Sequence, residues 1–102
     1  MDVIASRQLL AFDQRRGEFL ITVSMGRPYQ SADAEWACPV ALEGLHAGLA
    51  AMHGVDAWQA LMLGQSLLQV LLQHHLDSGG TLRDPETGDP VDVTGLFHGG
   101  GS

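Results

Sequence analysis

The chain has 102 residues, 45% of them hydrophobic and 17% charged, which is typical of one globular domain rather than a disordered segment. Twelve acidic residues against five arginines give a net charge of −7 at pH 7. Because so acidic a surface repels phosphate backbones and anionic lipid headgroups, we expect no nucleic-acid and no membrane partner. The charge favours the approach of a basic protein instead.

Two features of the sequence bear on the cellular compartment. Cys38 is the only cysteine, so no disulfide can form within the chain, as is usual in a reducing cytoplasm. The first ten residues include Asp2 and no long apolar run, so they do not resemble a signal peptide. We therefore expect a cytoplasmic protein.

The first half of the chain predicts strands. Residues 4–12 indicate a first strand, and a polar turn at residues 13–17 ends in glycine, which suits a hairpin. Residues 18–25 form the clearest strand, because every second residue from Phe19 to Met25 is large and apolar. A loop is expected over residues 26–33.

A third strand is predicted over residues 35–43. Its alternate residues, from Trp36 through Cys38 to Leu42, fall on one apolar face. Pro39 cannot donate a hydrogen bond to a neighbouring strand, which places this strand at a sheet edge or turns its missing donor outward. Residues 45–52 are expected to form a short helix that stops at residues 53–54.

The central prediction is a long helix over residues 57–76. These twenty residues carry no charge, are rich in leucine and contain no proline. Asp56 can cap the first turn while Gln59 reaches back, and residues 78–80 end the helix. The polar residues lie in one narrow stripe, so we expect a helix covered on most sides, by its own sheet or by a second subunit. Four glutamines, Ser66 and two histidines argue against a membrane span.

The C-terminal part predicts less. Residues 81–83 indicate a short last strand and residues 84–88 a tight turn, whereas residues 91–97 remain ambiguous. We expect a single α+β domain over residues 1–97 and a flexible glycine-rich tail over residues 98–102. In this fold a small, mainly antiparallel sheet of three to four strands, in the order β-β-β-α-β, packs on one long helix.

No pattern of residues points strongly to catalysis or to a bound metal. Cys38 with His46 is the most obvious nucleophile–base pair, but Cys38 shares its face with apolar residues and is predicted to be a core residue. The five histidines, including the adjacent His74 and His75, match no zinc spacing. The acids of residues 84–92 lack the spacing of a calcium loop. We expect no catalytic residue, no metal and no cofactor.

Residues 26–36 contain the best candidates for partner binding. Arg27, Tyr29 and Trp36 are of residue types favoured at interfaces, and Pro28 restricts the loop. An alternative interpretation is structural, in which Tyr29 and Trp36 close one end of the core and Arg27 pairs with a nearby acid.

Four segments together resemble a family of short bacterial proteins of unknown function. They are Gly26-x-Pro28-Tyr29, Trp36-x-Cys38-Pro39, Glu43-Gly44-Leu45 and Gly54-Val55-Asp56-x-x-Gln59-Ala60-Leu61. The resemblance covers nearly the whole chain and implies a strand hairpin, a third strand and one long helix in a compact domain. It carries over no catalytic residues, and the acidic C-terminal segment departs from the family pattern.

These features favour a non-enzymatic protein-interaction domain. An immunity-type inhibitor, which covers a toxin or another partner, fits the small size and the acidic charge. The apolar helix also predicts a homodimer. The alternative is a small-molecule-binding domain or enzyme, with a pocket between helix and sheet near Tyr29, Trp36 and Cys38.

Overall fold

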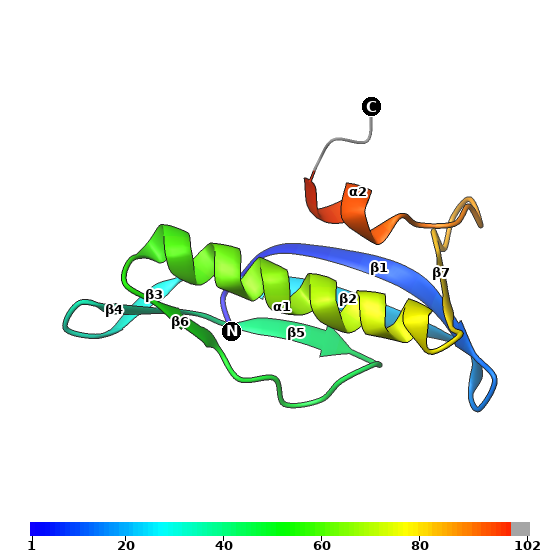
Figure 1. The fold of residues 1–102 in the computed structure, drawn as a ribbon, viewed down its shortest axis with the longest axis horizontal. Coiled ribbons are helices and arrows are strands. Elements are labelled where there is room, and N and C mark those ends of the chain that lie inside the picture. The colour runs from blue at the N-terminus through cyan, green and yellow to red at the C-terminus, as the bar shows by residue number, and fades with distance from the viewer. Residues whose placement is uncertain (99–102) are drawn as a thin grey trace.

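The structure is a computed structural model and describes residues 1–98 (Figure 1). Within these residues the chain forms seven strands and two helices. In chain order they are β1 (Val3–Asp13), β2 (Gly17–Gly26), β3 (Tyr29–Ala32), β4 (Glu35–Cys38), β5 (Val40–Glu43), β6 (Met52–Gly54), α1 (Ala57–Asp77), β7 (Thr81–Arg83) and α2 (Val93–His98).

The strands form two antiparallel sheets joined by one bent ribbon. The larger sheet has the order β5-β2-β1-β7, and the smaller one has the order β3-β4-β6. β2 continues into β3 and β4 into β5, so the pairs β2–β5 and β3–β4 are two halves of the same ribbon. At the bend, the Gly26 N–H donates to the Pro39 carbonyl at 2.8 Å. The α+β class and the long helix are confirmed.

Three predictions for residues 26–54 are wrong. The expected loop after Met25 contains β3, and the expected third strand is two strands in different sheets. They separate at Pro39, which has no N–H for a ladder and lies at the bend of the ribbon. The expected helix over residues 45–52 does not form, because Gly44 and Gly48 adopt positive φ. β6 follows instead and pairs with β4.

The ends of α1 follow the predicted capping pattern. The Asp56 carboxylate accepts a hydrogen bond from the Gln59 backbone N–H at 2.7 Å. The Gln59 side chain reaches back and accepts from the Val55 N–H at 2.8 Å, one residue before the cap. Such a cap contributes about 0.5–2 kcal/mol to helix stability. At the other end Ser78 is the C-cap and Gly79 has a φ of 95°, which a residue with a side chain rarely adopts.

One side of α1 packs against the strands of both sheets, and this contact forms the core. The buried helix residues recur at steps of four and three: Ala60, Gly64, Leu68, Leu72 and His75. They meet the inward residues of the strands, among which Leu9, Ile21, Leu42 and Cys38 are fully buried. The predicted inward row of β2 and the predicted apolar face of residues 36–42 are both part of this core.

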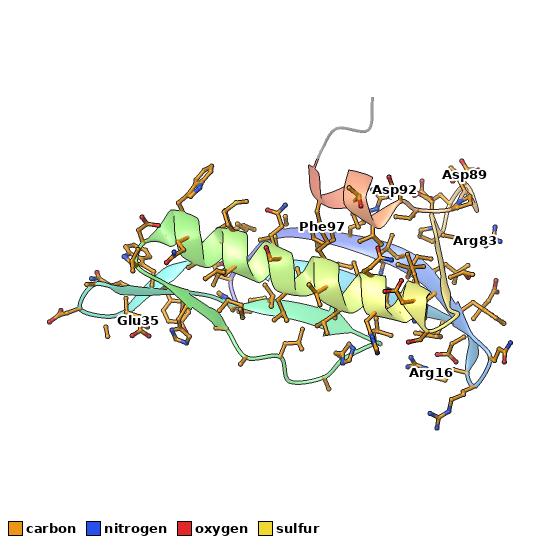
Figure 2. The ribbon with its side chains drawn as sticks, viewed as in Figure 1. Arg16, Glu35, Arg83, Asp89, Asp92 and Phe97 are labelled. Carbon is orange, nitrogen blue, oxygen red and sulfur yellow. The ribbon has the colours of Figure 1, made fainter. Side chains whose placement is uncertain are left out.

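The C-terminal segment closes one edge of the larger sheet. β7 confirms the predicted last strand and pairs with residues 10–12 of β1. The ambiguous segment contains α2, which packs on α1, and the Gln65 side chain donates a hydrogen bond to the Phe97 carbonyl at 2.6 Å (Figure 2). The expected tail lies outside the described residues except for His98, the last residue of α2. The single-domain assignment stays a prediction.

The contact between Gly54 and the first turn of α1 gives a stability test. A Cβ at residue 54 would lie 2.7 Å from the Ala60 nitrogen and 3.0 Å from the Gln59 Cβ, so the helix would have to shift. We expect Gly54→Ala to cost about 1–3 kcal/mol of unfolding free energy, because overpacking strains the backbone. Thermal unfolding should show it as a loss of roughly 4–8 °C in Tm per kcal/mol.

Ala50→Ser is the control for this test, because it enlarges an exposed loop residue. It should change the unfolding free energy by less than about 0.5 kcal/mol. Equal Tm values for both variants and the wild type would contradict the close approach of β6 to α1.

Candidate functional site

The side of α1 that faces away from the strands carries a row of exposed residues. Trp58, Met62, Ser66 and Val70 recur every four residues and are all exposed; we call this row the open face of α1. Trp58 is 73% exposed, Val70 62% and Met62 41%. Large apolar side chains therefore dominate a surface that a second layer of structure does not cover.

The open face is also free of charge. No residue from 57 to 76 is charged, whereas the solvent side of a helix usually carries charged and polar residues. The strands cover only one side of α1 (Figure 1), so of the two expected covers its own sheet supplies that side, and cover by a second subunit stays a prediction. The reason is the two-layer architecture, which buries one stripe of the helix and leaves the opposite stripe open. Contiguous apolar surface of this kind marks interaction sites.

The structure separates the three predicted partner-binding residues. Trp36 faces α1 and packs against the core, while Tyr29 is 49% exposed on the opposite side of the small sheet, where it pairs with Ala37. Arg27 lies at the bend of the ribbon. Its N–H donates to the Asp2 carbonyl at 2.8 Å, and its guanidinium lies 3.9 Å from the Asp2 carboxylate. Arg27, Tyr29 and Trp36 thus form no common surface.

Cys38 lies in the core and not in a pocket. Its side chain is fully buried, and its Sγ lies 3.2 Å from where a Cβ on Gly64 would be. Burial raises the pKa of the Cys38 thiol, so the nucleophilic thiolate is disfavoured. His46, its supposed base, lines a pocket at the far end of α1 that does not include Cys38.

The histidines whose side chains the structure describes, residues 46, 53, 74 and 75, do not gather into a metal site. His53 Nδ1 lies 2.7 Å from the Glu35 carboxylate on the small sheet. His75 is buried, and its Nε2 donates to the Thr81 carbonyl at 3.1 Å, since a carbonyl can only accept. Among residues 1–98, no three potential ligands converge on one point.

A pocket lies at the C-terminal end of α1, and we call it the α1-end pocket. It has a volume of about 620 Å³. The β1–β2 turn, the loop after β5 and the end of the helix all contribute to it. Its lining consists of Asp13, Gln14, Arg15, Arg16, Leu45, His46, Leu71, His74, His75, Ser78, Gly79 and Gly80.

Sequence reasoning did not identify this pocket. In the sequence, residues 13–17 indicate only a polar turn, and His46 and the pair His74–His75 lie far apart along the chain. The adjacent Arg15 and Arg16 in an otherwise acidic chain were the available signal. Only the fold brings the turn beside the helix end.

Comparison with known proteins supports the resemblance to an uncharacterised family. Residues 5–92 match the family model described as a domain of unknown function, DUF6968. The chain belongs to the DUF6968 family. A search of curated proteins and a search of solved structures each find no match. Within residues 1–98 of this family member, no helix combines the length and apolarity that crossing a membrane requires.

In this DUF6968 chain the acids of residues 84–92 build a turn. The Asp84 carboxylate accepts hydrogen bonds from the backbone N–H groups of Glu86 and Thr87, at 2.8 and 3.1 Å. These bonds, the Thr87 one most strongly, lower the pKa of Asp84, and the Arg7 guanidinium 3.3 Å away adds to the effect. The carboxylate is therefore engaged by the turn itself.

The lowered pKa of Asp84 predicts a pH-dependent contribution to stability. A carboxylate with a folded-state pKa below its ordinary value of 3.8 stabilises the fold above that pH, and the contribution is lost as pH falls through the folded value. Asp84→Asn should therefore lower Tm at neutral pH, and wild type and variant should converge as the pH falls below 3.8. Glu86→Gln, in the same turn, is the control. A pH-independent difference for Asp84→Asn would contradict the assignment.

Proposed function

We propose that this chain is a non-enzymatic protein-interaction domain, and that its open face of α1 binds a second copy of the chain. One observation supports the proposal most directly: the open face combines an exposed tryptophan with exposed Met62 and Val70 and has no charge along its length. Tryptophan is among the residue types that contribute most binding energy at interfaces. An uncharged surface can face its own copy without bringing like charges together.

The spacing of the open face suits packing against itself. In a two-fold dimer a residue on the symmetry axis meets its own copy. With Ser66 on that axis, Met62 lies against the partner's Val70, and Trp58 lies towards the partner's His74. A small residue at the centre allows the two helices to approach closely, and rows of residues four apart are the ridges of the commonest helix-packing class.

The size of this surface indicates a weak dimer. α1 has 21 residues, so it is about 31 Å long at 1.5 Å per residue. One face of a single helix covers less than the roughly 800 Å² per partner of a stable interface, which points to a dissociation constant on the order of micromolar. Two chains of charge −7 also repel each other, so added salt should strengthen the dimer.

The acidic surface supports a further partner of opposite charge. We infer an immunity-type role in the bacterial cytoplasm, in which the domain covers a basic toxin or another basic protein. The support is the small size, the charge of −7 and the resemblance to short bacterial proteins. Salt would weaken such a complex, whereas it would strengthen the homodimer, so the sign of the salt effect distinguishes the two contacts.

Analytical ultracentrifugation tests the homodimer. From about 5 to 200 µM, a range around the expected affinity, the wild type should shift from monomer towards dimer. Trp58→Glu and Val70→Glu should each remain monomeric, because each variant removes an apolar contact and, through the two-fold axis, brings two carboxylates into the interface. Raising salt from about 50 to 500 mM should increase the dimer fraction of the wild type.

The control for these variants is Leu20→Glu. Leu20 is 50% exposed and lies on β2 between two inward residues, so it faces the side of the sheet away from α1. This variant should dimerise as the wild type does. A wild type that stays monomeric over the whole range, or a dimer that Leu20→Glu disrupts and Trp58→Glu does not, would reject the assignment to the open face.

A further inference from the structure

The cationic side chains of this acidic protein are concentrated in one place. The α1-end pocket is lined by two of the five arginines and by three of the five histidines. Its only acid is Asp13. A pocket beside β1, in contrast, combines Arg7 with Asp84 and Glu86. The α1-end pocket therefore has an excess of positive charge on a molecule of net charge −7.

Hydrogen bonds within the β1–β2 turn engage the one acid. The Asp13 carboxylate accepts from the backbone N–H groups of Arg15 and Arg16, at 2.9 and 2.7 Å. It also accepts from Arg16 Nε at 3.1 Å. These contacts, with the Arg16 backbone N–H first, lower the pKa of Asp13. Asp13 thus holds the turn in shape and is paired with Arg16, so it offers little free charge to the pocket.

Arg16 is fixed in place by several contacts. Its Nη1 donates to the Gly44 carbonyl at 2.9 Å, and its guanidinium carbon lies 3.8 Å from the centre of the Phe19 ring. Phe19 packs edge-on against the His75 ring, whose Nε2 is hydrogen-bonded to the Thr81 carbonyl. Arg16 and His75 are therefore structural, and Figure 2 shows Arg16 beside the end of α1.

Three cationic or ionisable side chains of the pocket are not held by such contacts. Within residues 1–98, Arg15 is the one arginine whose guanidinium makes no hydrogen bond or ion pair, and the His46 and His74 rings make none either. All three are exposed and come from three different elements. Guanidinium and protonated imidazole groups are the donors that bind phosphate and carboxylate oxygens.

The C-terminal end of α1 repels an anion electrostatically, so this repulsion has to be compared with the attraction by the arginines. The last turn of a helix carries about half a negative charge, from carbonyls without partners. Here the carbonyls of His74, His75 and Leu76 accept from the N–H groups of residues 78–80, each at 3.0 Å. One full charge on Arg15, with Arg16 balancing Asp13, exceeds this partial charge.

We propose that the α1-end pocket binds a small ligand through an oxyanion group, either the phosphate of an organic phosphate or a carboxylate, with Arg15, His46 and His74 as the binding residues. All three binding residues come from one chain, so the pocket does not need the dimer; of the three, only His74 would lie near the partner's Trp58 in the proposed dimer. The charged and titratable groups that face it are Asp13, Arg15, Arg16, His46, His74 and His75.

NMR of the imidazole C–H resonances tests the site, with sulfate as the tetrahedral probe and acetate as the carboxylate probe. At constant ionic strength and pH, sulfate or acetate should shift the His46 and His74 resonances saturably. The affinity should fall on the order of threefold to tenfold in Arg15→Gln or His74→Gln.

His53 and Arg27 are the internal controls. His53 pairs with Glu35, which Figure 2 shows at the opposite end of the molecule from Arg16, so its resonance should stay constant. Arg27→Gln removes an exposed arginine elsewhere and should leave the affinity unchanged. Equal shifts at His53, or affinities that Arg15→Gln and His74→Gln do not alter, would overturn the proposal. The stronger of the two probes identifies the oxyanion.

Discussion

The close approach of α1 to the bent ribbon is the contact on which the rest of the structure depends. It is possible because the residues at the contact are small. Gly54 lies directly against the first turn of the helix, and Gly64 lies over Val40 and Cys38 at the bend. A side chain at Gly54 would displace the helix, and one at Gly64 would press on the side chains of Val40 and Cys38. The bend at Pro39 matters for the same reason, since it lets one helix contact strands of both sheets.

This packing also explains why the two proposed binding surfaces differ. A helix that lies on one layer of strands buries one stripe and exposes the other, and in α1 the exposed stripe is as uncharged as the buried one. The charges lie instead on the strands and turns. Two arginines and three histidines collect where the β1–β2 turn reaches the end of the helix. The open face and the α1-end pocket therefore occupy different parts of the same helix and approach each other only at His74.

The sequence predicted the features that depend on neighbouring residues better than those that depend on distant ones. The alternation in β2, the capping of α1 by Asp56 and the turn after β7 involve neighbouring residues, and all three are found in the structure. β3, β6 and the division between β4 and β5 were missed, because short strands are defined by their partners in space rather than by their own pattern. The loop candidates Arg27, Tyr29 and Trp36 are close in sequence, but neighbouring residues of a strand point to opposite sides of the sheet. The α1-end pocket joins residues 13–16 to residues 74–80, a distance that no motif in the sequence spans.

The sequence by itself determined the α+β class, the bounds of α1, the core position of Cys38 and the excess of negative charge. Each of these follows from composition or from a repeat of two or of three to four residues, and such repeats act through adjacent turns and pleats. The tertiary structure alone decided which stripe of α1 stays open and where the arginines and histidines meet. Those outcomes depend on the bend of the ribbon at Pro39 and on the contacts of Gly54 and Gly64. Packing brings together segments that are far apart in the sequence, and no periodic pattern of residues indicates such contacts.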